Sequence, residues 1–175
     1  MAAATLSASR STALYVNFGA PLRVYEALYY HPAKAGSVCV GKEWYRFPTS
    51  FFLPRSGGNV VPLLWLNSSF NGLLPRPFEA WPGGLSVVPP HMNDRNEEEP
   101  SRCSQLADCS LVVDLELPHQ VEARLDRGTW ETLVCEPFLD AESSRLPWRA
   151  FHLPFGLSQK RNTYAQYCVW KRKGA

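Results

Sequence analysis

The sequence has no long apolar run and no excess of charge of either sign. A membrane-spanning helix needs about 20 consecutive apolar residues, whereas the longest uncharged stretch, residues 56–75, is interrupted repeatedly by Gly, Pro and Asn. Lys and Arg number 18 against 16 Asp and Glu, so the net charge predicts no strongly basic field that would attract nucleic acid or an anionic membrane surface. Residues 1–10 lack the basic start and apolar core of a secretory signal. Taken alone, these absences predict a cytosolic chain that binds no nucleic acid.

The motifs of common active sites are missing as well. The four histidines lie far apart, no Gly-x-Ser-x-Gly elbow occurs, and no glycine-rich phosphate loop precedes a helix. The cysteines form no Cys-x-x-Cys pair and have no His partner at zinc-ligand spacing. We therefore expect no metal ion and no cofactor.

What the sequence does contain is typical of one globular domain. A chain of 175 residues with 45% hydrophobic content is large enough to bury roughly 70% of its unfolded surface. The 15 prolines and 13% aromatic residues favour a loop-rich body over a coiled coil or a disordered tail.

The cysteines and one Asn triplet allow two interpretations. In a reducing compartment, which we favour from the residues alone, the five thiols would be small buried apolar groups; in an oxidising one, up to two disulfides would form and leave one thiol. These residues are Cys39, Cys103, Cys109, Cys135 and Cys168. Asn67-Ser68-Ser69 is a glycosylation sequon, which matters only in the secretory lumen.

The first half of the chain predicts a strand, helix, strand unit after a helix. Apolar residues at helical spacing predict a short amphipathic helix over 21–31. The runs 37–40 and 60–66 predict strands, with a short helix over 48–52 between them. Residues 74–90 hold too many Pro and Gly for any long element and predict a loop.

The second half predicts strands. Aromatic and β-branched residues concentrate at 111–115, 130–138, 150–155 and 164–170. The chain as a whole predicts a single mixed α/β domain, with short helices early and a largely antiparallel set of strands late.

Two clusters are rich in residue types that bind ligands. The first, Gly-Lys-Glu-Trp-Tyr-Arg-Phe-Pro at 41–48, follows the first predicted strand, where open α/β sheets present binding loops. Lys42 and Arg46 would hold a phosphate, Glu43 would supply an acid, and Trp44 and Tyr45 would stack on a sugar. The alternative, which we favour on the residues alone, is that the aromatic residues anchor the core and the charges pair on the surface.

The second cluster lies at 92–102. Its amides, carboxylates and arginine would hydrogen-bond the hydroxyls of a glycan. The residues concerned are Asn93, Asp94, Asn96, Glu98, Glu99 and Arg102. Runs of acidic residues are more often solvated faces, so here too the plain interpretation is favoured.

The motifs in these clusters resemble one family. The sequence Val-Cys-Val-Gly-Lys-Glu-Trp-Tyr-Arg-Phe-Pro at 38–48 and the motifs Met-Asn-Asp at 92–94 and Glu-Glu-Pro-Ser-Arg at 98–102 are similar to endoplasmic-reticulum α-1,2-mannosyltransferases of the Alg9 type, in glycosyltransferase family 22. Further collinear matches are Pro75, 77–78, Val112, 114–115, 137–141, 149–151 and 154–155. The resemblance covers nearly all of the chain from about Ser9 onward.

The resemblance implies a multispan enzyme that transfers mannose from dolichyl-phosphate-mannose to the lipid-linked oligosaccharide of N-glycan assembly. About ten spans of about 20 residues each would need more residues than this chain has, so the catalytic part is expected upstream. On the resemblance we therefore assign no catalytic residue in this chain. The chain would then be the lumenal C-terminal domain, with a helical segment at 1–35 that follows the last membrane helix and an α/β domain at 36–175.

This setting reverses the cytosolic prediction and makes Asn67 a candidate glycan acceptor. The expected partners are the lipid-linked oligosaccharide and the membrane-spanning body of the same enzyme; the donor is a substrate rather than a cofactor. Two alternatives stay open. One is a stand-alone, non-catalytic glycan- or partner-binding module from a truncated product. The other is an unrelated small α/β enzyme that uses Lys42, Glu43 and Asp114, should these converge in one pocket.

Overall fold

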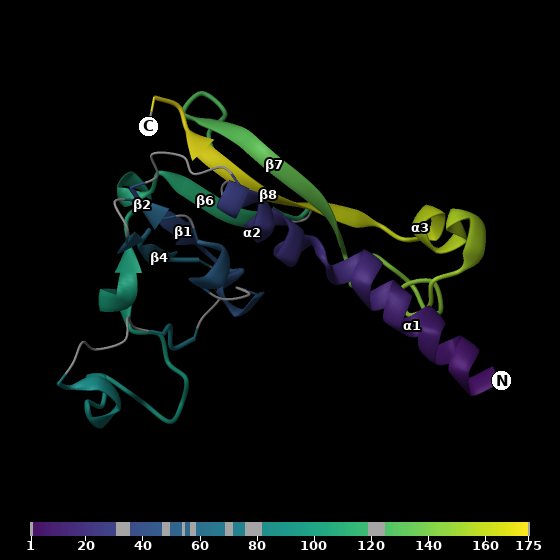
Figure 1. Ribbon diagram of the computed structural model, residues 1–175, viewed down its shortest axis with the longest axis horizontal. Helices are drawn as coiled ribbons and strands as arrows, with labels where there is room; N and C mark the ends of the chain where they lie inside the picture. The colour runs from purple at the N-terminus through teal and green to yellow at the C-terminus, as the bar shows by residue number, and fades with distance from the viewer. Residues whose placement is uncertain are drawn as a thin grey trace.

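A computed structural model of the 175-residue chain describes residues 2–30, 36–46, 50–53, 55–56, 59–68, 72–75, 82–118 and 125–174. A sheet with helix α2 on it lies at one end of the elongated molecule, and helices α1 and α3 lie at the other (Figure 1). The helices are α1 (Ala2–Phe18), α2 (Ala20–Tyr30) and α3 (Leu157–Arg161). The strands are β1 (Val38–Val40), β2 (Arg55–Ser56), β3 (Asn59–Val60), β4 (Leu63–Leu66), β5 (Cys103–Ser104), β6 (Leu111–Glu116), β7 (Trp130–Leu139) and β8 (Tyr164–Arg172).

The helix predicted over 21–31 is confirmed as α2. Val24, Tyr25 and Leu28 are buried, whereas Leu22 and Tyr29 are exposed. Helix α1 precedes it directly. Gly19 stands between the two helices, where a Cβ atom would lie 2.4 Å from the carbonyl oxygen of Tyr15; only glycine lets the backbone approach so closely.

The main sheet is mixed, which confirms the predicted α/β class. Its strand order is β5-β4-β1-β6-β8-β7. The first four strands run parallel to their neighbours, and β8 pairs antiparallel with both β6 and β7. Strands 37–40, 111–115, 130–138 and 164–170 are therefore confirmed as β1, β6, β7 and β8.

Three predicted elements need correction. The strand predicted over 60–66 is split at Pro62 into β3, which pairs with β2, and β4 in the main sheet. Of the helix predicted over 48–52, the described part is a 3₁₀ turn at Ser50–Phe52, and Pro48 lies outside the described residues. The strand predicted over 150–155 is wrong: these residues form turns and the start of a 3₁₀ helix at Pro154–Gly156.

Proline and a helix contact explain the last error. Pro154 has no backbone N–H to give to a sheet ladder. The backbone N–H of His152 donates to the carbonyl of Ser9 in α1 at 3.1 Å instead. The segment therefore attaches to a helix, although its residue types favour a strand.

The sheet separates two apolar layers. One layer joins α2 to alternate residues of β1, β6 and β8: Val38, Val40, Leu111, Val113, Leu115, Tyr167 and Val169. The residues between them face the other layer, which contains Cys39, Val112, Cys168 and Trp170 together with Trp130. This period of two is what a strand imposes, and both layers are packed because the central strands are buried on both sides.

Two disulfides lie in the second layer and at its edge. Cys39 in β1 is bonded to Cys109, 70 residues later, and Cys135 in β7 is bonded to its register partner Cys168 in β8. Cys103 is the free thiol. The reduced interpretation is thus wrong for four cysteines, because the topology brings the two pairs to Cα–Cα distances of 5.7 and 4.1 Å, which spacing along the chain did not show.

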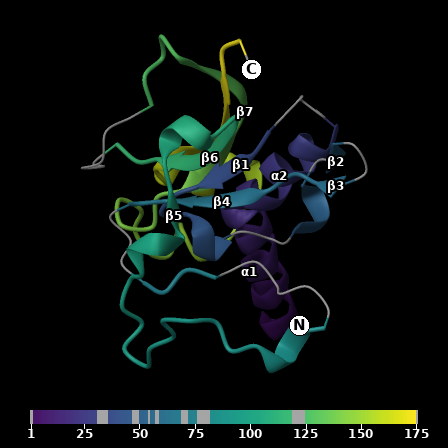
Figure 2. The ribbon, with the colours of Figure 1, turned by 90° about the vertical axis from the view of Figure 1, so that its left-hand side faces the viewer.

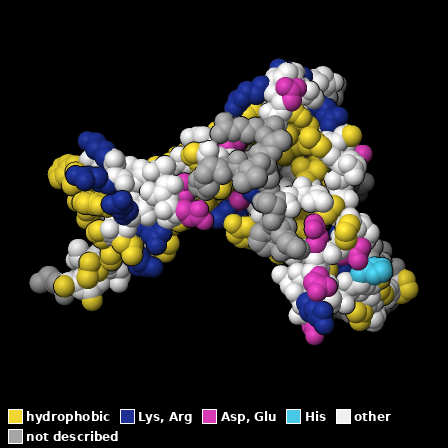
Figure 3. Space-filling view, turned by 180° about the vertical axis from the view of Figure 1, so that it is seen from behind, with side chains coloured by type: hydrophobic (Ala, Val, Ile, Leu, Met, Phe, Trp, Pro, Cys, Tyr) yellow, Lys and Arg dark blue, Asp and Glu magenta, His cyan; other side chains and the backbone are white. Residues whose placement is uncertain are grey.

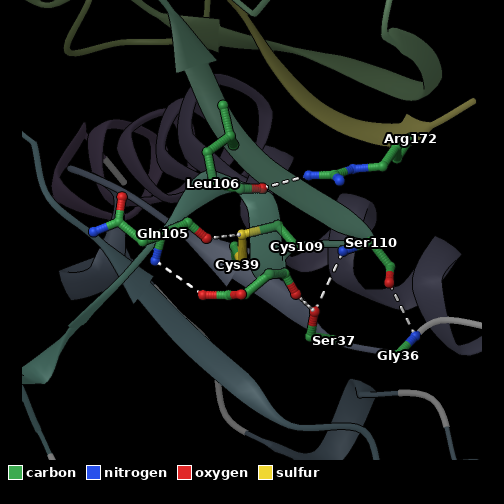
Figure 4. Close-up of a disulfide and its surroundings, with 9 residues drawn as sticks. Gly36, Ser37, Cys39, Gln105, Leu106, Cys109, Ser110 and Arg172 are labelled. Atoms are coloured by element: carbon green, nitrogen blue, oxygen red, sulfur yellow. Dashed lines mark hydrogen bonds between the residues drawn. A yellow bond between two sulfur atoms is a disulfide. The ribbon is translucent and has the colours of Figure 1, made fainter.

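Hydrogen bonds hold the segment around the first disulfide (Figure 4). The Ser37 hydroxyl donates to the carbonyl of Asp108 at 2.5 Å and accepts from the backbone N–H of Ser110 at 3.3 Å. Arg172 donates to the carbonyl of Leu106 at 2.5 Å. The turn before β6 is therefore hydrogen-bonded to the residue that precedes β1 and to β8.

The predicted loop over 74–90 is confirmed for its described residues, which contain only a 3₁₀ turn at Gly84–Ser86. With the following residues to Pro100 it extends away from the sheet (Figure 2). Among the described residues, no helix has the length and apolar content required to cross a bilayer.

Candidate functional site

The first sequence cluster lies at the carboxyl end of β1. After Gly41 the chain turns sharply: the backbone N–H of Trp44 donates to the Gly41 carbonyl at 3.1 Å, and that of Arg46 to the Glu43 carbonyl at 2.9 Å. Because β4, β1 and β6 are parallel, their carboxyl ends meet at one edge of the sheet. This is the edge at which open α/β sheets bind ligands.

Lys42 forms an ion pair with a residue of the neighbouring strand. Its Nζ atom lies 2.6 Å from Oδ1 of Asp114 in β6, and both side chains are mostly shielded from solvent. Oδ1 of Asp114 also accepts from the backbone N–H of Leu115 at 2.9 Å. Two charges held this way are fixed in position, and short charge-assisted bonds of this kind are among the stronger ones in proteins.

Glu43 is the buried charge of the cluster. Its side chain is 3% exposed and accepts from Arg46 at 2.5 Å. Burial raises the pKa of Glu43, and the Arg46 guanidinium opposes that shift. Arg46 lies 4.6 Å from the ring centroids of both Tyr45 and Phe138, so it links the turn to β7 through cation–π contacts.

Two surface hollows adjoin this edge, and Lys42 lines both. The larger, about 640 Å³, lies on the disulfide side of the sheet between β4, β6 and the segment 100–106. Its polar lining includes Asn67, Ser104, Gln105 and Asp114. The smaller, about 350 Å³, lies beside Phe18 of α1 and includes Glu43, Tyr45 and Arg46.

The structure separates the aromatic residues of the first cluster by role. Trp44 is half-buried and packs against the α2 layer, as the packing interpretation expected. Tyr45 is exposed and lines the smaller hollow, so its ring is accessible to a ligand. Phe47 and Pro48 lie outside the described residues.

The second cluster mainly supports its own loop. Arg102 donates to the carbonyls of Leu74 and Pro90, and Asn96 accepts from the backbone N–H of Leu73 at 2.9 Å. Asn93 donates to the Glu97 carbonyl at 3.0 Å and accepts from its backbone N–H at 2.8 Å. These contacts connect the two ends of the loop that contains the cluster.

The carboxylates of this cluster lie near the same loop. Glu99 accepts from the backbone N–H of Ser101 at 3.2 Å. Hydrogen bonds from the side chain of Ser101 and from this backbone N–H hold the pKa of Glu99 below its usual range. Glu98 accepts from the Cys103 thiol at 3.7 Å, and Asp94 is exposed. Pro100 and Cys103 line the larger hollow, whereas none of the six residues predicted in this cluster does. Among the described residues, Pro100 is thus the part of the second cluster that lines the same hollow as Lys42 of the first.

Sequence reasoning placed Asp114 only in the enzyme alternative, and the structure makes it the partner of Lys42. The available signal was its position within the strand predicted over 111–115. Asn67 is exposed at the end of β4. Among the described residues, no three His, Cys, Asp or Glu side chains are grouped to hold a metal ion.

This arrangement of fixed donors, acceptors and one exposed aromatic ring fits hydroxyl-rich ligands, and the relatives of the chain are glycosyltransferases. The chain is 41% identical to the mouse α-1,2-mannosyltransferase ALG9 and 40% identical to the human one, each over 97% of this chain. The Arabidopsis thaliana protein of the same name is 37% identical over 95% of the chain.

The chain is therefore homologous to a region of the ALG9 α-1,2-mannosyltransferases, which confirms the family resemblance. This homology excludes the alternative of an unrelated small α/β enzyme. It spans about 29% of the length of these curated relatives. No family model matches the chain, and no solved structure matches it.

Proposed function

We propose that the chain is the lumenal, non-catalytic part of an α-1,2-mannosyltransferase of the endoplasmic reticulum. The whole enzyme would transfer mannose from dolichyl-phosphate-mannose to the lipid-linked oligosaccharide, with the chemistry performed in a membrane-spanning part of the same protein. The observation that carries the proposal is collinear similarity to the mouse α-1,2-mannosyltransferase over 97% of the chain.

The disulfides support the proposed compartment. Both disulfides fit an oxidising environment such as the lumen. Three of their four cysteines are almost completely buried. An exposed Asn67 in a sequon fits the same environment.

Within this proposal, the edge at the end of β1 would contact the acceptor glycan. The Lys42–Asp114 pair offers a donor and an acceptor in fixed positions beside the larger hollow, and Tyr45 offers a ring face beside the smaller one. Sugars are bound by such combinations of directed hydrogen bonds and aromatic stacking.

A chimera tests the proposal. This chain would replace the matching region of the mouse relative, and membranes containing the chimera would be supplied with dolichyl-phosphate-mannose and lipid-linked oligosaccharide. We expect mannose transfer by the chimera, none by the relative lacking the region, and none by the isolated chain. Immunoblotting of the membranes separates lost activity from lost protein.

Site variants in the same chimera test the role of the edge. Lys42→Ala/Asp114→Ala removes both members of the pair together, so no charge is left unpaired. We expect the KM for the oligosaccharide to rise at least about fivefold, with a smaller change in kcat, because binding rather than chemistry is lost. Lys173→Ala, whose side chain contacts the carbonyl of Arg127 elsewhere, is the matched control.

Two outcomes would count against the proposal. A chimera present at normal amounts that transfers no mannose would refute the enzymatic assignment. Saturable binding of oligosaccharide by the isolated chain, without any effect of the chain on transfer, would favour the stand-alone binding module instead.

A further inference from the structure

The end of the molecule away from the sheet has an unusual surface, which we call the basic tip and define as residues 2–22 and 143–163. It contains α1 and the turns around α3 (Figure 1). Ser9 and His152 hold the two segments together through reciprocal hydrogen bonds of 2.9 and 3.1 Å. Asn17 adds a bond to the carbonyl of Arg149 at 3.2 Å.

The basic tip has cations and no carboxylate. It contains five of the 18 Lys and Arg residues and none of the 16 Asp and Glu residues, so its net charge is +5 and that of the rest of the chain is −3. The five cations are Arg10, Arg145, Arg149, Lys160 and Arg161. All except the half-buried Arg149 are exposed. The small net charge of the whole chain conceals this separation.

Large apolar side chains are exposed among these cations. Phe155 is 93% exposed, Leu146 65% and Leu157 48%, and Leu6 of α1 is exposed as well. In Figure 3, hydrophobic and basic side chains gather at the end that carries α1 and α3, and no acidic side chain is visible there. Clusters of exposed apolar residues mark surfaces that bind a protein, a membrane or a ligand.

The backbone at Phe155 shows that its exposure is held in place. Phe155 has a φ of 60°, and Gly156, which follows it, has a φ of 69°. Glycine adopts this left-handed region readily, whereas a bulky residue there is strained by on the order of 1 kcal/mol. Strained backbone positions are concentrated at functional sites, and here one carries a ring that is exposed to solvent.

We propose that the basic tip binds the surface of an anionic phospholipid bilayer. Lys and Arg attract acidic headgroups, with about 1 kcal/mol per residue near the surface, and exposed Phe and Leu side chains insert at the boundary with the acyl chains. The complete absence of carboxylates from the basic tip favours this partner, because a lipid surface presents negative charge everywhere while a protein partner usually presents both signs. The tip would bind lipid whether or not the whole protein transfers mannose.

Co-sedimentation of the purified 175-residue chain with vesicles tests this proposal. We expect binding to phosphatidylcholine vesicles that contain about 30% phosphatidylserine, weaker binding as salt increases, and little binding to phosphatidylcholine alone. Phe155→Ser should lower the partition coefficient roughly tenfold, and Lys160→Glu should lower it by a similar factor.

Two control variants lie far from the basic tip. Val88→Ser replaces another exposed apolar side chain, and Arg95→Glu makes the same change in net charge as Lys160→Glu. Both should bind vesicles like the unmodified chain, and circular dichroism should show all four variants equally folded.

The proposal is overturned if the chain does not bind anionic vesicles, or if Lys160→Glu and Arg95→Glu reduce binding equally. It is also overturned if light scattering shows a dimer that Phe155→Ser dissociates, because the basic tip would then bind a second copy of the chain.

Discussion

Asn17 is a buried polar side chain that joins α1 to the rest of the molecule. It donates to the carbonyl of Arg149 at 3.2 Å and accepts from the Tyr164 hydroxyl of β8 at 2.8 Å. We expect Asn17→Ala to lower the free energy of unfolding by about 2 kcal/mol, because both partners lose their bond in a shielded site. Denaturant unfolding measures this change.

Thr12→Ala is the control for that measurement. The exposed hydroxyl of Thr12 bonds only within its own helix, to the carbonyl of Ala8 at 2.9 Å. Its loss should change the free energy of unfolding by less than about 0.5 kcal/mol. Equal effects of the two variants would contradict the role assigned to Asn17.

Glu43 predicts a pH dependence. Burial raises its pKa above the ordinary 4.5, so the folded state holds a proton more tightly than the unfolded chain does. This contribution to stability is complete below the unfolded pKa and is lost as the pH rises through the folded pKa. We therefore expect stability relative to Glu43→Gln to decline as the pH rises above about 4.5. Urea unfolding of both proteins checks the decline, and a constant difference would refute it.

At the residue scale, sequence proximity determined what could be predicted. Lys42, Glu43 and Arg46 could be placed together because one turn contains them. The Asp114 partner could not, because 72 residues separate it from Lys42 and only the parallel pairing of β1 with β6 brings them together. The cation–π contact of Arg46 with Phe138 depends on tertiary structure in the same way.

At the scale of elements, strands could be predicted where their side chains contribute to both apolar layers, as in β6 and β8. The segment 150–155 has similar residue types but contacts α1, so local pattern misled the prediction. Helix α1 was expected only as part of the helical segment 1–35 that the family resemblance implies, because its own residues are only mildly apolar. Its attachment by Ser9 and Asn17 is polar and gives no hydrophobic periodicity.

The disulfides predict a graded loss of stability. Replacing Cys39 and Cys109 by Ala should lower the free energy of unfolding by about 4 kcal/mol, and replacing Cys135 and Cys168 by slightly less. The difference follows from sequence separations of 70 and 33 residues, since the longer loop restricts the unfolded chain more. Cys103→Ala is the control with no crosslink to lose, and thermal unfolding compares the three.

At the scale of the whole molecule, the exposed loop and the first disulfide together predict a cleavage pattern. Trypsin should cut early at Arg95, whose side chain is 78% exposed. The two pieces should stay together on a gel without reductant and separate with it, because Cys39 and Cys109 lie on opposite sides of the cut. Pieces that separate without reductant would show that this disulfide is absent.

The charge of the whole molecule could be counted from sequence but not located. The net charge of +2, from which we expected no attraction to an anionic membrane surface, is only an average over the chain. The basic tip arises because two segments more than 120 residues apart, both without acidic residues, are folded side by side. Composition averages over such a separation, and only the fold reveals it.

The Cys39–Cys109 bond closes a covalent ring that contains β2, β3, β4, β5 and the long loop. The entropy of closing a ring grows only with the logarithm of its length, so ten more residues in this one would cost about 0.1 kcal/mol. Because this cost is so small, insertions or deletions in the loop are tolerated while the disulfide keeps β1 and the turn before β6 together.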